Sequence, residues 1–162
     1  MIRSPKSSLT HPMGSREKIA LFNMITEYLP GARVLDAFAG SGALGIEALS
    51  RGASEVVFVE KNAKIALLIK DNLRGLDLES QTEVIISEAG DYSSENDFDL
   101  IIADPPYDRF EIDEVVHLVE LLRAKGLFVL SHPDSSPVIP GLKLVKTRQY
   151  AGATISIYSK DA

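Results

Sequence analysis

A glycine-rich turn is the first stretch of this chain whose residue types and spacing could do chemistry. Gly40, Gly42 and Gly45 have the G-x-G-x-x-G spacing of nucleotide-binding turns and follow a largely apolar run over residues 32–37. In such a turn the first glycine permits a sharp bend, the second lets the backbone approach a ligand, and the third lets a helix pack closely on the strand. The helix that begins there directs free N–H groups toward the turn. A turn that binds no ligand can share this pattern, so the residues around it must show whether this turn binds a nucleotide.

Two acidic residues accompany the turn. Asp36 ends the first apolar run, and Glu60 ends a second one, residues 56–60, twenty positions after Gly40. A carboxylate in the position of Glu60 can accept hydrogen bonds from ribose hydroxyls. Asp36 would repel the pyrophosphate of a dinucleotide but attract the positively charged amino acid end of S-adenosylmethionine. The two carboxylates therefore favour S-adenosylmethionine over NAD as the cofactor.

A second candidate site is the segment Asp104-Pro105-Pro106-Tyr107, which directly follows an apolar run over residues 98–103. Ligands of open α/β sheets bind at the carboxyl ends of strands near the switch in strand order, so Asp104 should face the glycine turn. Two prolines fix the backbone. The Asp104 carboxylate and the Pro105 carbonyl could then accept hydrogen bonds from the amino group of a planar base, and Tyr107 could stack on it. A proline-stiffened surface turn is the alternative for this segment taken alone.

The elements that must position these residues alternate along the chain. Apolar periodicity predicts helices over residues 15–29, from the glycine turn to 50, 65–75 and 115–126, and strands over 32–37, 56–60, 83–87, 98–103, 127–130, 142–150 and 154–158. Strands and helices that alternate in this way form a parallel, doubly wound sheet. The last two strands, joined by Ala151-Gly152, should add an antiparallel hairpin. We expect one α/β domain over residues 15–162, with a mostly parallel seven-stranded sheet, after a flexible basic arm over residues 1–14.

Composition narrows the possible classes of protein. The chain has 162 residues, of which 45% are hydrophobic and 25% charged, as expected for a single globular domain. It contains no cysteine, which excludes disulfides, cysteine-based zinc sites and a cysteine nucleophile. We expect no metal ion. No apolar run is long enough to span a membrane and the N-terminus lacks the apolar core of a signal peptide, so we expect a cytoplasmic protein with no membrane contact.

The distribution of charge is uneven. The net charge is −6, which disfavours a general nucleic-acid-binding protein. Residues 1–23 nevertheless carry four cations, Arg3, Lys6, Arg16 and Lys18, against one acid, Glu17, a balance of +3. The segment from residue 141 onward carries Lys143, Lys146, Arg148 and Lys160 against Asp161, again a balance of +3. Contacts to phosphates need only a local basic face.

The glycine turn and the segment Asp104–Tyr107, which we call the proline loop, together resemble the motifs of a known family. Asp-Pro-Pro-Tyr at 104–107, with the turn from Asp36 to Gly42, is characteristic of S-adenosylmethionine-dependent amino-group methyltransferases. The run over residues 35–53 is similar to that of the bacterial 16S ribosomal RNA guanine-N2 methyltransferases, the RsmD family. Pro12, Arg16 and residues 20–23 resemble the first helix of that family. This chain departs from the family in a shorter basic segment before Pro12, in residues 11–14, and in His132 where an acid often ends the fifth strand.

The resemblance implies a Rossmann-like class I methyltransferase that transfers a methyl group from S-adenosylmethionine to the exocyclic N2 amine of a guanine in 16S ribosomal RNA. It implies cofactor contacts from Asp36, Phe38, Gly40, Ser41, Gly42, Glu60, Lys61, Glu88, Ala89 and Asp104. It places catalysis on Asp104, Pro105, Pro106 and Tyr107, and RNA contacts on Arg3, Lys6, His11 and Arg16. The expected partner is ribosomal RNA or the assembling small ribosomal subunit, bound by a monomer.

Two other functions fit the same residues. The Asp-Pro-Pro-Tyr loop would also serve a methyltransferase acting on DNA adenine or on a protein amide. A chain of 162 residues has no room for a separate target-recognition domain, which disfavours the DNA enzyme. A non-catalytic RNA-binding module of the same fold is the other alternative, and the intact set Asp36, Gly40, Gly42, Glu60 and Asp104 argues against it.

Overall fold

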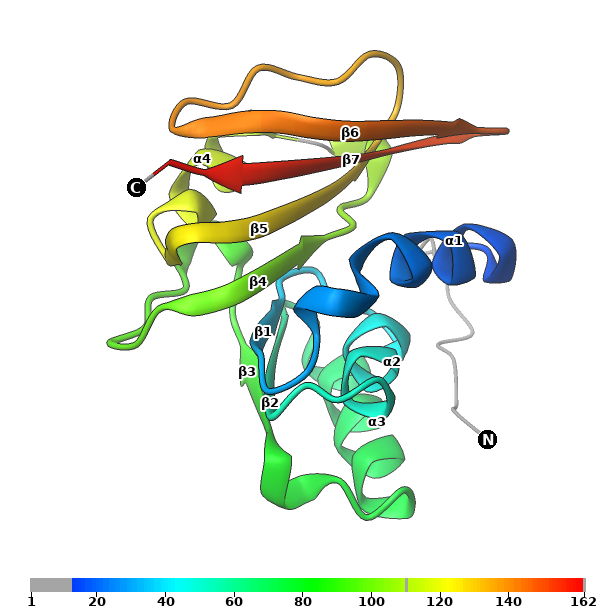
Figure 1. Ribbon diagram of the computed structural model, residues 1–162. Helices are drawn as coiled ribbons and strands as arrows, with labels where there is room; N and C mark the ends of the chain where they lie inside the picture. Colours follow the sequence, from blue (N-terminus) through cyan, green and yellow to red (C-terminus); the bar gives the residue numbers. More distant parts are fainter. Residues whose placement is uncertain (1–12, 110, 162) are drawn as a thin grey trace.

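A computed structural model describes residues 13–109 and 111–161 of the chain (Figure 1). Its helices are α1 (Ser15–Ile25), α2 (Ala43–Ser50), α3 (Ala63–Gly75) and α4 (Ile112–Val119), with short 3₁₀ turns at Thr26–Tyr28, Glu79–Gln81, Ala89–Asp91 and Tyr107–Arg109. Its strands are β1 (Arg33–Asp36), β2 (Glu55–Glu60), β3 (Thr82–Ile86), β4 (Phe98–Ala103), β5 (Leu122–His132), β6 (Leu142–Tyr150) and β7 (Ala153–Lys160).

All seven strands form one sheet in the order β3-β2-β1-β4-β5-β7-β6. The first five strands pair in parallel, and β7 pairs antiparallel with both β5 and β6. The strand order reverses between β1 and β4, which lie side by side, so the ends of these two strands form the switch point where ligands bind in such sheets. This confirms the predicted doubly wound sheet and its antiparallel hairpin.

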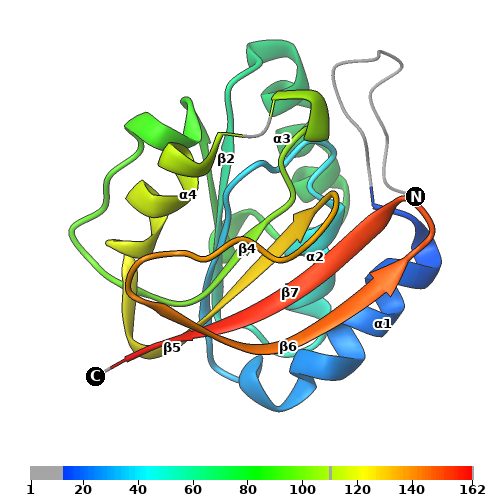
Figure 2. The same cartoon turned by 90° about the horizontal axis from the view of Figure 1, so that it is seen from above.

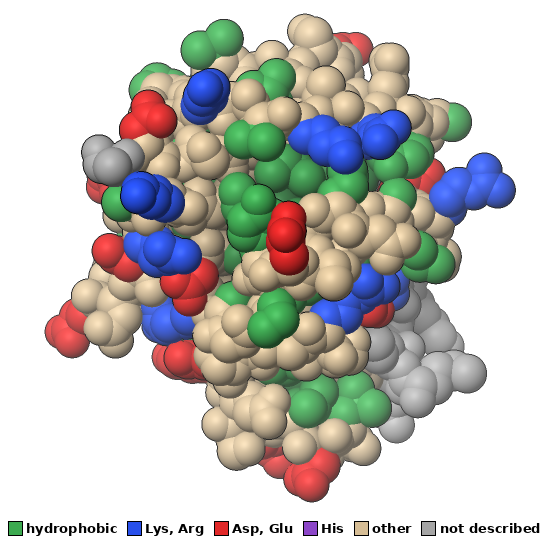
Figure 3. All heavy atoms as spheres, in the orientation of Figure 1, with side chains coloured by type: hydrophobic (Ala, Val, Ile, Leu, Met, Phe, Trp, Pro, Cys, Tyr) green, Lys and Arg blue, Asp and Glu red, His purple; other side chains and the backbone are tan. Residues whose placement is uncertain are grey.

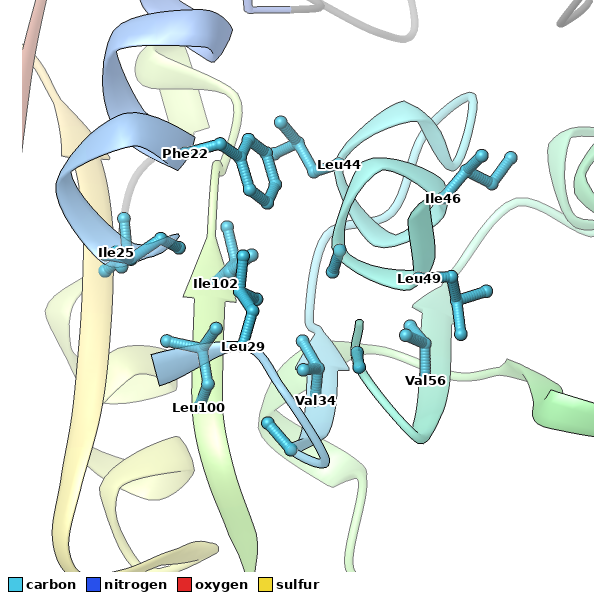
Figure 4. Close-up of a cluster of buried hydrophobic side chains, with 14 of the residues drawn as sticks. Phe22, Ile25, Leu29, Val34, Leu44, Ile46, Leu49, Val56, Leu100 and Ile102 are labelled. Atoms are coloured by element: carbon cyan, nitrogen blue, oxygen red, sulfur yellow. The ribbon is translucent and has the colours of Figure 1, made fainter. Parts of the chain in front are cut away.

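Helices cover both faces of the sheet (Figures 1 and 2). One apolar cluster joins α1, α2 and α3 to one face, and a second joins α4 to the other face. Consecutive strand residues alternate between the clusters, as Val34 and Leu35 do. Figure 4 shows the first cluster, in which Phe22 of α1 and Leu44 of α2 pack above Ile102 of β4. Because the central strands are buried on both faces, the ends of β1 and β4 are held rigidly.

The predicted helix over residues 115–126 extends too far, and the predicted fifth strand starts too late. The helix ends at Val119, and β5 already begins at Leu122, which pairs with Phe98 of β4. The register then shifts, so that Leu100 pairs with Leu127. Gly126 therefore lies inside an irregular part of β5 rather than at a helix end. The apolar residues of this stretch fit both the helical period and the strand period, so the sequence pattern alone does not separate the two structures. Pairing with β4 makes the residues from Leu122 onward a strand.

The helix predicted over residues 15–29 is also shorter than expected. It begins at Ser15, with Gly14 as its N-cap residue, and becomes a 3₁₀ turn after Ile25.

No helix in the described ranges is long and apolar enough to cross a membrane. The same ranges hold no group of three or more His, Asp or Glu residues arranged to bind a metal ion.

Candidate active site

The glycine turn joins β1 to α2, and each of its glycines has a different role. Gly40 and Gly42 adopt φ values of 54° and 83°, a region that L-residues with side chains rarely occupy. Gly42 is the N-cap residue of α2, and its N–H donates to the Ala39 carbonyl at 2.8 Å. A Cβ on Gly45 would lie 2.3 Å from Cε1 of Phe58 on β2. The third glycine therefore permits close packing of helix on strand, as expected.

A cavity lies above this turn, at the carboxyl ends of the central strands. All but two of the predicted cofactor-binding residues line it, namely Phe38, Gly40, Ser41, Glu60, Lys61, Glu88, Ala89 and Asp104. The two exceptions are Asp36 and Gly42, which lie outside the lining. The lining also includes residues that sequence reasoning missed, Met13, Ser15 and Lys18 from the start of α1 and Glu114 from α4. The start of α1 and α4 thus wall the cavity.

Glu60 holds the glycine turn as well as lining the cavity. The residue is buried. Its Oε1 accepts a hydrogen bond from the Gly40 N–H at 3.0 Å, and its Oε2 accepts one from the Asn62 N–H at 2.8 Å. A carboxylate oxygen has two lone pairs, so each oxygen retains an acceptor position. Glu60 can therefore fix the turn and still receive hydroxyl groups from the cavity.

Asp36 lies behind the turn. The residue is fully buried, and its Oδ2 accepts a hydrogen bond from the Gly45 N–H at 3.0 Å. Its Oδ1 has no hydrogen-bond partner among the described residues. Burial raises the pKa of Asp36 to about 8; the Gly45 bond lowers it, and the charges of Asp104 and Glu60 add to the increase. With this pKa the Asp36 carboxyl group is largely protonated at neutral pH, and its role is to orient the start of α2 through the bond from the Gly45 N–H.

Asp104 lies at the junction of the cavity and a second hollow. The second hollow is lined by Met13, Gly14, Glu17, Asp104, Pro105, Tyr107, Asp108, Ala151, Gly152 and Ala153. It therefore brings the start of α1, the proline loop and the β6–β7 turn together. Asp104 and Met13 line both spaces. A group bound in the second hollow would meet a ligand of the first cavity beside the Asp104 carboxyl group.

Ser131 supports the proline loop from the neighbouring strand. Its hydroxyl shares a short hydrogen bond with the Tyr107 hydroxyl, and the residue is buried at the end of β5. Burial raises the pKa of Asp104 to about 7, and a hydrogen bond from the Ser131 side chain opposes this increase. Ser131 therefore contacts both polar side chains of the loop. Sequence reasoning missed it, although its place at the carboxyl end of a strand beside β4 could have indicated it.

Comparison with known proteins now places the chain in a family. Residues 1–159 match the family model described as Conserved hypothetical protein 95. Ribosomal RNA small subunit methyltransferase D of Haemophilus influenzae is 35% identical over 136 residues, which cover 79% of this chain and 70% of that protein. The protein of the same name from Escherichia coli is 32% identical over 166 residues, which cover 98% of this chain and 83% of that protein.

The chain belongs to the RsmD family of S-adenosylmethionine-dependent methyltransferases. The solved structure of yhhF from Escherichia coli superposes with a TM-score of 0.87 at 26% identity, covering 98% of this chain and 92% of that chain. A magnesium protoporphyrin IX methyltransferase from Synechocystis, solved with bound S-adenosylmethionine, shares the fold alone, with a TM-score of 0.71 at 15% identity over 90% of this chain and 80% of that chain. The predicted family, class I methyltransferase fold and cofactor are confirmed.

The cavity of this RsmD-family chain has the charge that the cofactor requires. Four of its lining carboxyl groups come from Glu60, Glu88, Asp104 and Glu114, and only Lys18 and Lys61 carry positive charge. Asp36 adds a buried carboxyl group that is largely protonated at neutral pH, and its Oδ1 has no hydrogen-bond partner among the described residues. S-adenosylmethionine carries a sulfonium and an ammonium group and no phosphate, so the donor set fits it.

The remaining predicted residues lie elsewhere. Arg16 is exposed on the first turn of α1 and lines neither the cavity nor the second hollow. Arg3, Lys6 and His11 lie outside the described residues. His132 is buried, and its ring forms hydrogen bonds with the Pro133 carbonyl at 3.0 Å and with the Ser156 hydroxyl at 2.7 Å. His132 therefore ties β5 to β7 and lines neither space.

Proposed function

We propose that this chain transfers the methyl group of S-adenosylmethionine to the exocyclic N2 amine of a guanine in 16S ribosomal RNA. The observation that supports this most directly is the position of Asp104, which lines both the cofactor cavity and the hollow beside Tyr107. A planar base in that hollow would have its amine next to the Asp104 carboxyl group. The RsmD-type relatives are named as small-subunit ribosomal RNA methyltransferases, which favours ribosomal RNA as the substrate.

Different residues of the cavity lining contact different parts of the cofactor. In this proposal Glu60 receives the ribose hydroxyls, and Glu88 and Ala89 lie beside the adenine. Phe38, Gly40, Ser41 and Lys61 complete the wall. Asp36 holds the start of α2 through the bond from the Gly45 N–H, and Gly42 shapes the turn; neither residue lines the cavity. The bound cofactor would supply a methyl group on a sulfonium. Attack of the amine nitrogen in line on the methyl carbon would break the carbon–sulfur bond and release the neutral thioether, and the methylated nitrogen would then lose a proton to solvent.

The proline loop acts on the amine that receives the methyl group. The Asp104 carboxylate and the Pro105 carbonyl accept its two N–H groups, which directs the nitrogen lone pair toward the cavity. The carboxylate also stabilises the positive charge that develops on the nitrogen. Pro105 and Pro106 keep the loop rigid, and the ring of Tyr107 gives the base a surface to stack on. The target base must leave its stack, at a cost of a few kcal/mol that a loop or single-stranded site reduces.

The RNA contacts proposed from the sequence involve the basic residues of the N-terminal part, Arg3, Lys6, His11 and Arg16. Arg16 is exposed at the start of α1, next to the residues that line the second hollow. A cation there can bind a phosphate that flanks the target base. We propose that the protein acts as a monomer in the cytoplasm, on ribosomal RNA or on the assembling small subunit.

One comparison favours a second candidate, methylation of a protein amide. A release factor glutamine methyltransferase of Shewanella oneidensis is 38% identical over 87 residues, which cover 53% of this chain but only 30% of that protein. Asp104 and Pro105 could also orient a glutamine amide, because that group is planar and carries two N–H donors. The RsmD-type relatives match across a much larger share of both chains, which makes ribosomal RNA the better proposal for the substrate.

Analysis of nucleosides tests the proposal directly. Ribosomal RNA from a strain that lacks this protein is digested and analysed by mass spectrometry, with wild-type protein or Asp104→Ala restored to the strain. We expect N2-methylguanosine in 16S RNA to fall in the deletion strain, to return with wild-type protein and to stay low with the variant. An unchanged N2-methylguanosine content in the deletion strain would contradict the guanine assignment. Loss of glutamine methylation in that strain would favour the second candidate.

A further inference from the structure

Strand β6 carries a row of cations at the edge of the sheet. Its sequence, residues 142–150, contains Lys143, Lys146 and Arg148 and no acidic residue. All three cations are exposed. Figure 3 shows Lys and Arg side chains over the part of the molecule where Figure 1 places β6. This row lies in a protein whose net charge is −6, so it is a local feature rather than part of a generally basic surface.

An irregularity in β6 brings the three cations onto one face. Lys143 pairs with Ser159, Lys146 with Ile157 and Arg148 with Ile155, and the register shifts between Leu144 and Lys146. Directly opposed residues of an antiparallel pair share a face, and alternate residues of β7 share a face as well. In a regular strand, residues 143 and 146 would point to opposite faces. The extra residue removes this difference and aligns the cations.

The face that carries the cations is the one that α1 covers. Ile155 and Ile157 belong to the apolar cluster that contains Leu21 and Phe22 of α1. The strand then runs to Tyr150 and into the turn whose Ala151 and Gly152 line the second hollow. The row of cations therefore begins at the far edge of the sheet and leads, over roughly 15 Å of strand, toward the place where the target base would bind.

The charges of these three side chains have no ionic partner in the part of the chain that the structure describes. Within residues 13–109 and 111–161, none of the three makes an ion pair. Other cations are engaged: Arg51 pairs with Glu47 at 2.8 Å, and Lys160 donates to the Val119 and Leu122 carbonyls. Cations on one face that lack internal partners are available to an anionic ligand.

A second surface near the proline loop is acidic, in contrast to the basic β6 strand. A hollow beside the cofactor cavity is lined by Lys61, Glu88, Gly90, Asp91, Asp108, Glu111, Asp113 and Glu114. This acidic surface repels a polyanion, whereas the β6 face attracts one. The two surfaces together restrict how a nucleic acid can reach the proline loop.

We propose that the β6 face, defined by Lys143, Lys146 and Arg148, binds the phosphate backbone of the RNA that carries the target base. The proposal rests on RNA being the substrate of the proposed function. The three cations hold successive phosphates, and the strand guides the chain toward the second hollow. Lysines on an edge strand also oppose pairing with a second sheet, so self-association through β6 is the competing role, which the experiment must distinguish.

The test compares two variants with the same change in charge. One is Lys143→Gln, Lys146→Gln, Arg148→Gln on β6, and the other is Lys64→Gln, Lys70→Gln, Arg74→Gln on α3, where all three side chains are exposed. Binding of a fluorescently labelled single-stranded RNA is measured over a range of salt concentrations. Three lost phosphate contacts should reduce the slope of log K against log salt by about 2 and weaken binding at least about tenfold at low salt. The α3 variant should bind as the wild type does.

Three further measurements make the outcome decisive. S-adenosylmethionine affinity and the melting temperature of the β6 variant should equal those of the wild type. An unchanged salt slope, or an equal loss in both variants, would overturn the β6 assignment. So would a wild-type dimer in sedimentation whose dissociation follows the β6 substitutions while RNA binding does not. If the wild-type protein binds RNA through β6 but its deletion leaves the N2-methylguanosine content of 16S RNA unchanged, the proposed function is refuted and the β6 assignment stands.

Discussion

Among single residues, Asp104 has the central position in the proposed function, because it lines both the cavity and the second hollow. We expect Asp104→Ala to lower the single-turnover rate of RNA methylation by about a hundredfold or more at saturating cofactor, since the amine loses one of its two acceptors. Asp104→Asn should lose less, because an amide oxygen still accepts a hydrogen bond. Cofactor affinity, measured by calorimetry, should fall much less than the rate in either variant, because the other residues that line the cavity, Glu60 among them, remain in place. Near-normal turnover in Asp104→Ala would show that the chemistry lies elsewhere.

Ser131 gives a second prediction at the same scale, on pH dependence. Its hydrogen bond favours the ionised form of Asp104, so Ser131→Ala should raise the pKa of that carboxyl group above its value of about 7. Because the ionised form accepts the amine, the acidic limb of the rate profile should move to higher pH. Tyr107→Phe removes the other partner of Ser131 but leaves the serine free for Asp104, so its acidic limb should not move. Coincident profiles for Ser131→Ala and wild type would remove Ser131 from the mechanism.

At the scale of elements, the contact of α2 with β2 depends on Gly45. A methyl group at this position would lie 2.3 Å from Cε1 and 2.7 Å from Cζ of the buried Phe58. We expect Gly45→Ala to reduce the free energy of unfolding by about 1–3 kcal/mol, as overpacking does. Gly75→Ala is the matched control, because no atom lies within 4 Å of its added Cβ. Urea denaturation should show a lower midpoint for Gly45→Ala and an equal or higher midpoint for Gly75→Ala.

Glu60 connects two elements, so its loss should affect both binding and stability. The bonds from the Gly40 and Asn62 N–H groups show that Glu60→Ala also leaves two backbone donors without their acceptor. We expect weaker S-adenosylmethionine binding in calorimetry and a loss of about 1–3 kcal/mol in the free energy of unfolding. Glu60→Gln retains one acceptor oxygen, so its cofactor affinity and its free energy of unfolding should both fall less than those of Glu60→Ala. Unchanged affinity in Glu60→Ala would contradict its role in the cavity.

At the scale of the whole molecule, two buried carboxyl groups make folding stability depend on pH. Burial raises the pKa of Asp36 to about 8 and that of Asp104 to about 7, whereas in the unfolded chain both have values near 3.8. Between pH 4 and 8 the folded protein therefore binds more protons than the unfolded chain, and its stability falls as the pH rises. The fall should be on the order of a few kcal/mol.

The variant Asp36→Asn checks this prediction. An amide cannot ionise, so the denaturant midpoint of the variant should fall less than that of the wild type between pH 5 and 9. Its Oδ1 can retain the bond from the Gly45 N–H that Asp36 accepts at 3.0 Å. Parallel pH profiles for the two proteins would mean that Asp36 keeps an ordinary pKa in the folded state.

The molecule as a whole also separates charge in a way that composition does not reveal. The acidic surface beside the cofactor cavity and the basic β6 face lie on different elements, around one proline loop. A net charge of −6 disfavours nucleic-acid binding when it is considered alone. The arrangement instead allows an anionic substrate on one side and a cationic cofactor on the other.

The sequence by itself determined the order of the elements, the fold class and most of the cofactor cavity. Apolar runs, glycine spacing and the acids at strand ends are local features, and parallel strands always bring their carboxyl ends to one edge of the sheet. Glu60, Glu88 and Asp104 could therefore be assigned to one cavity before their contacts were known. The structure confirms that all three line it.

Only the tertiary structure decided which side chains meet across that edge. Ser131 reaches Tyr107 because β5 pairs with β4 in one register, and the β6 cations share a face because of one extra residue in the pairing with β7. Asp36 accepts a hydrogen bond from the Gly45 N–H at the start of α2 and does not line the cavity. Register, bulges and the depth of burial arise from packing between segments far apart in the chain, and local periodicity does not contain them.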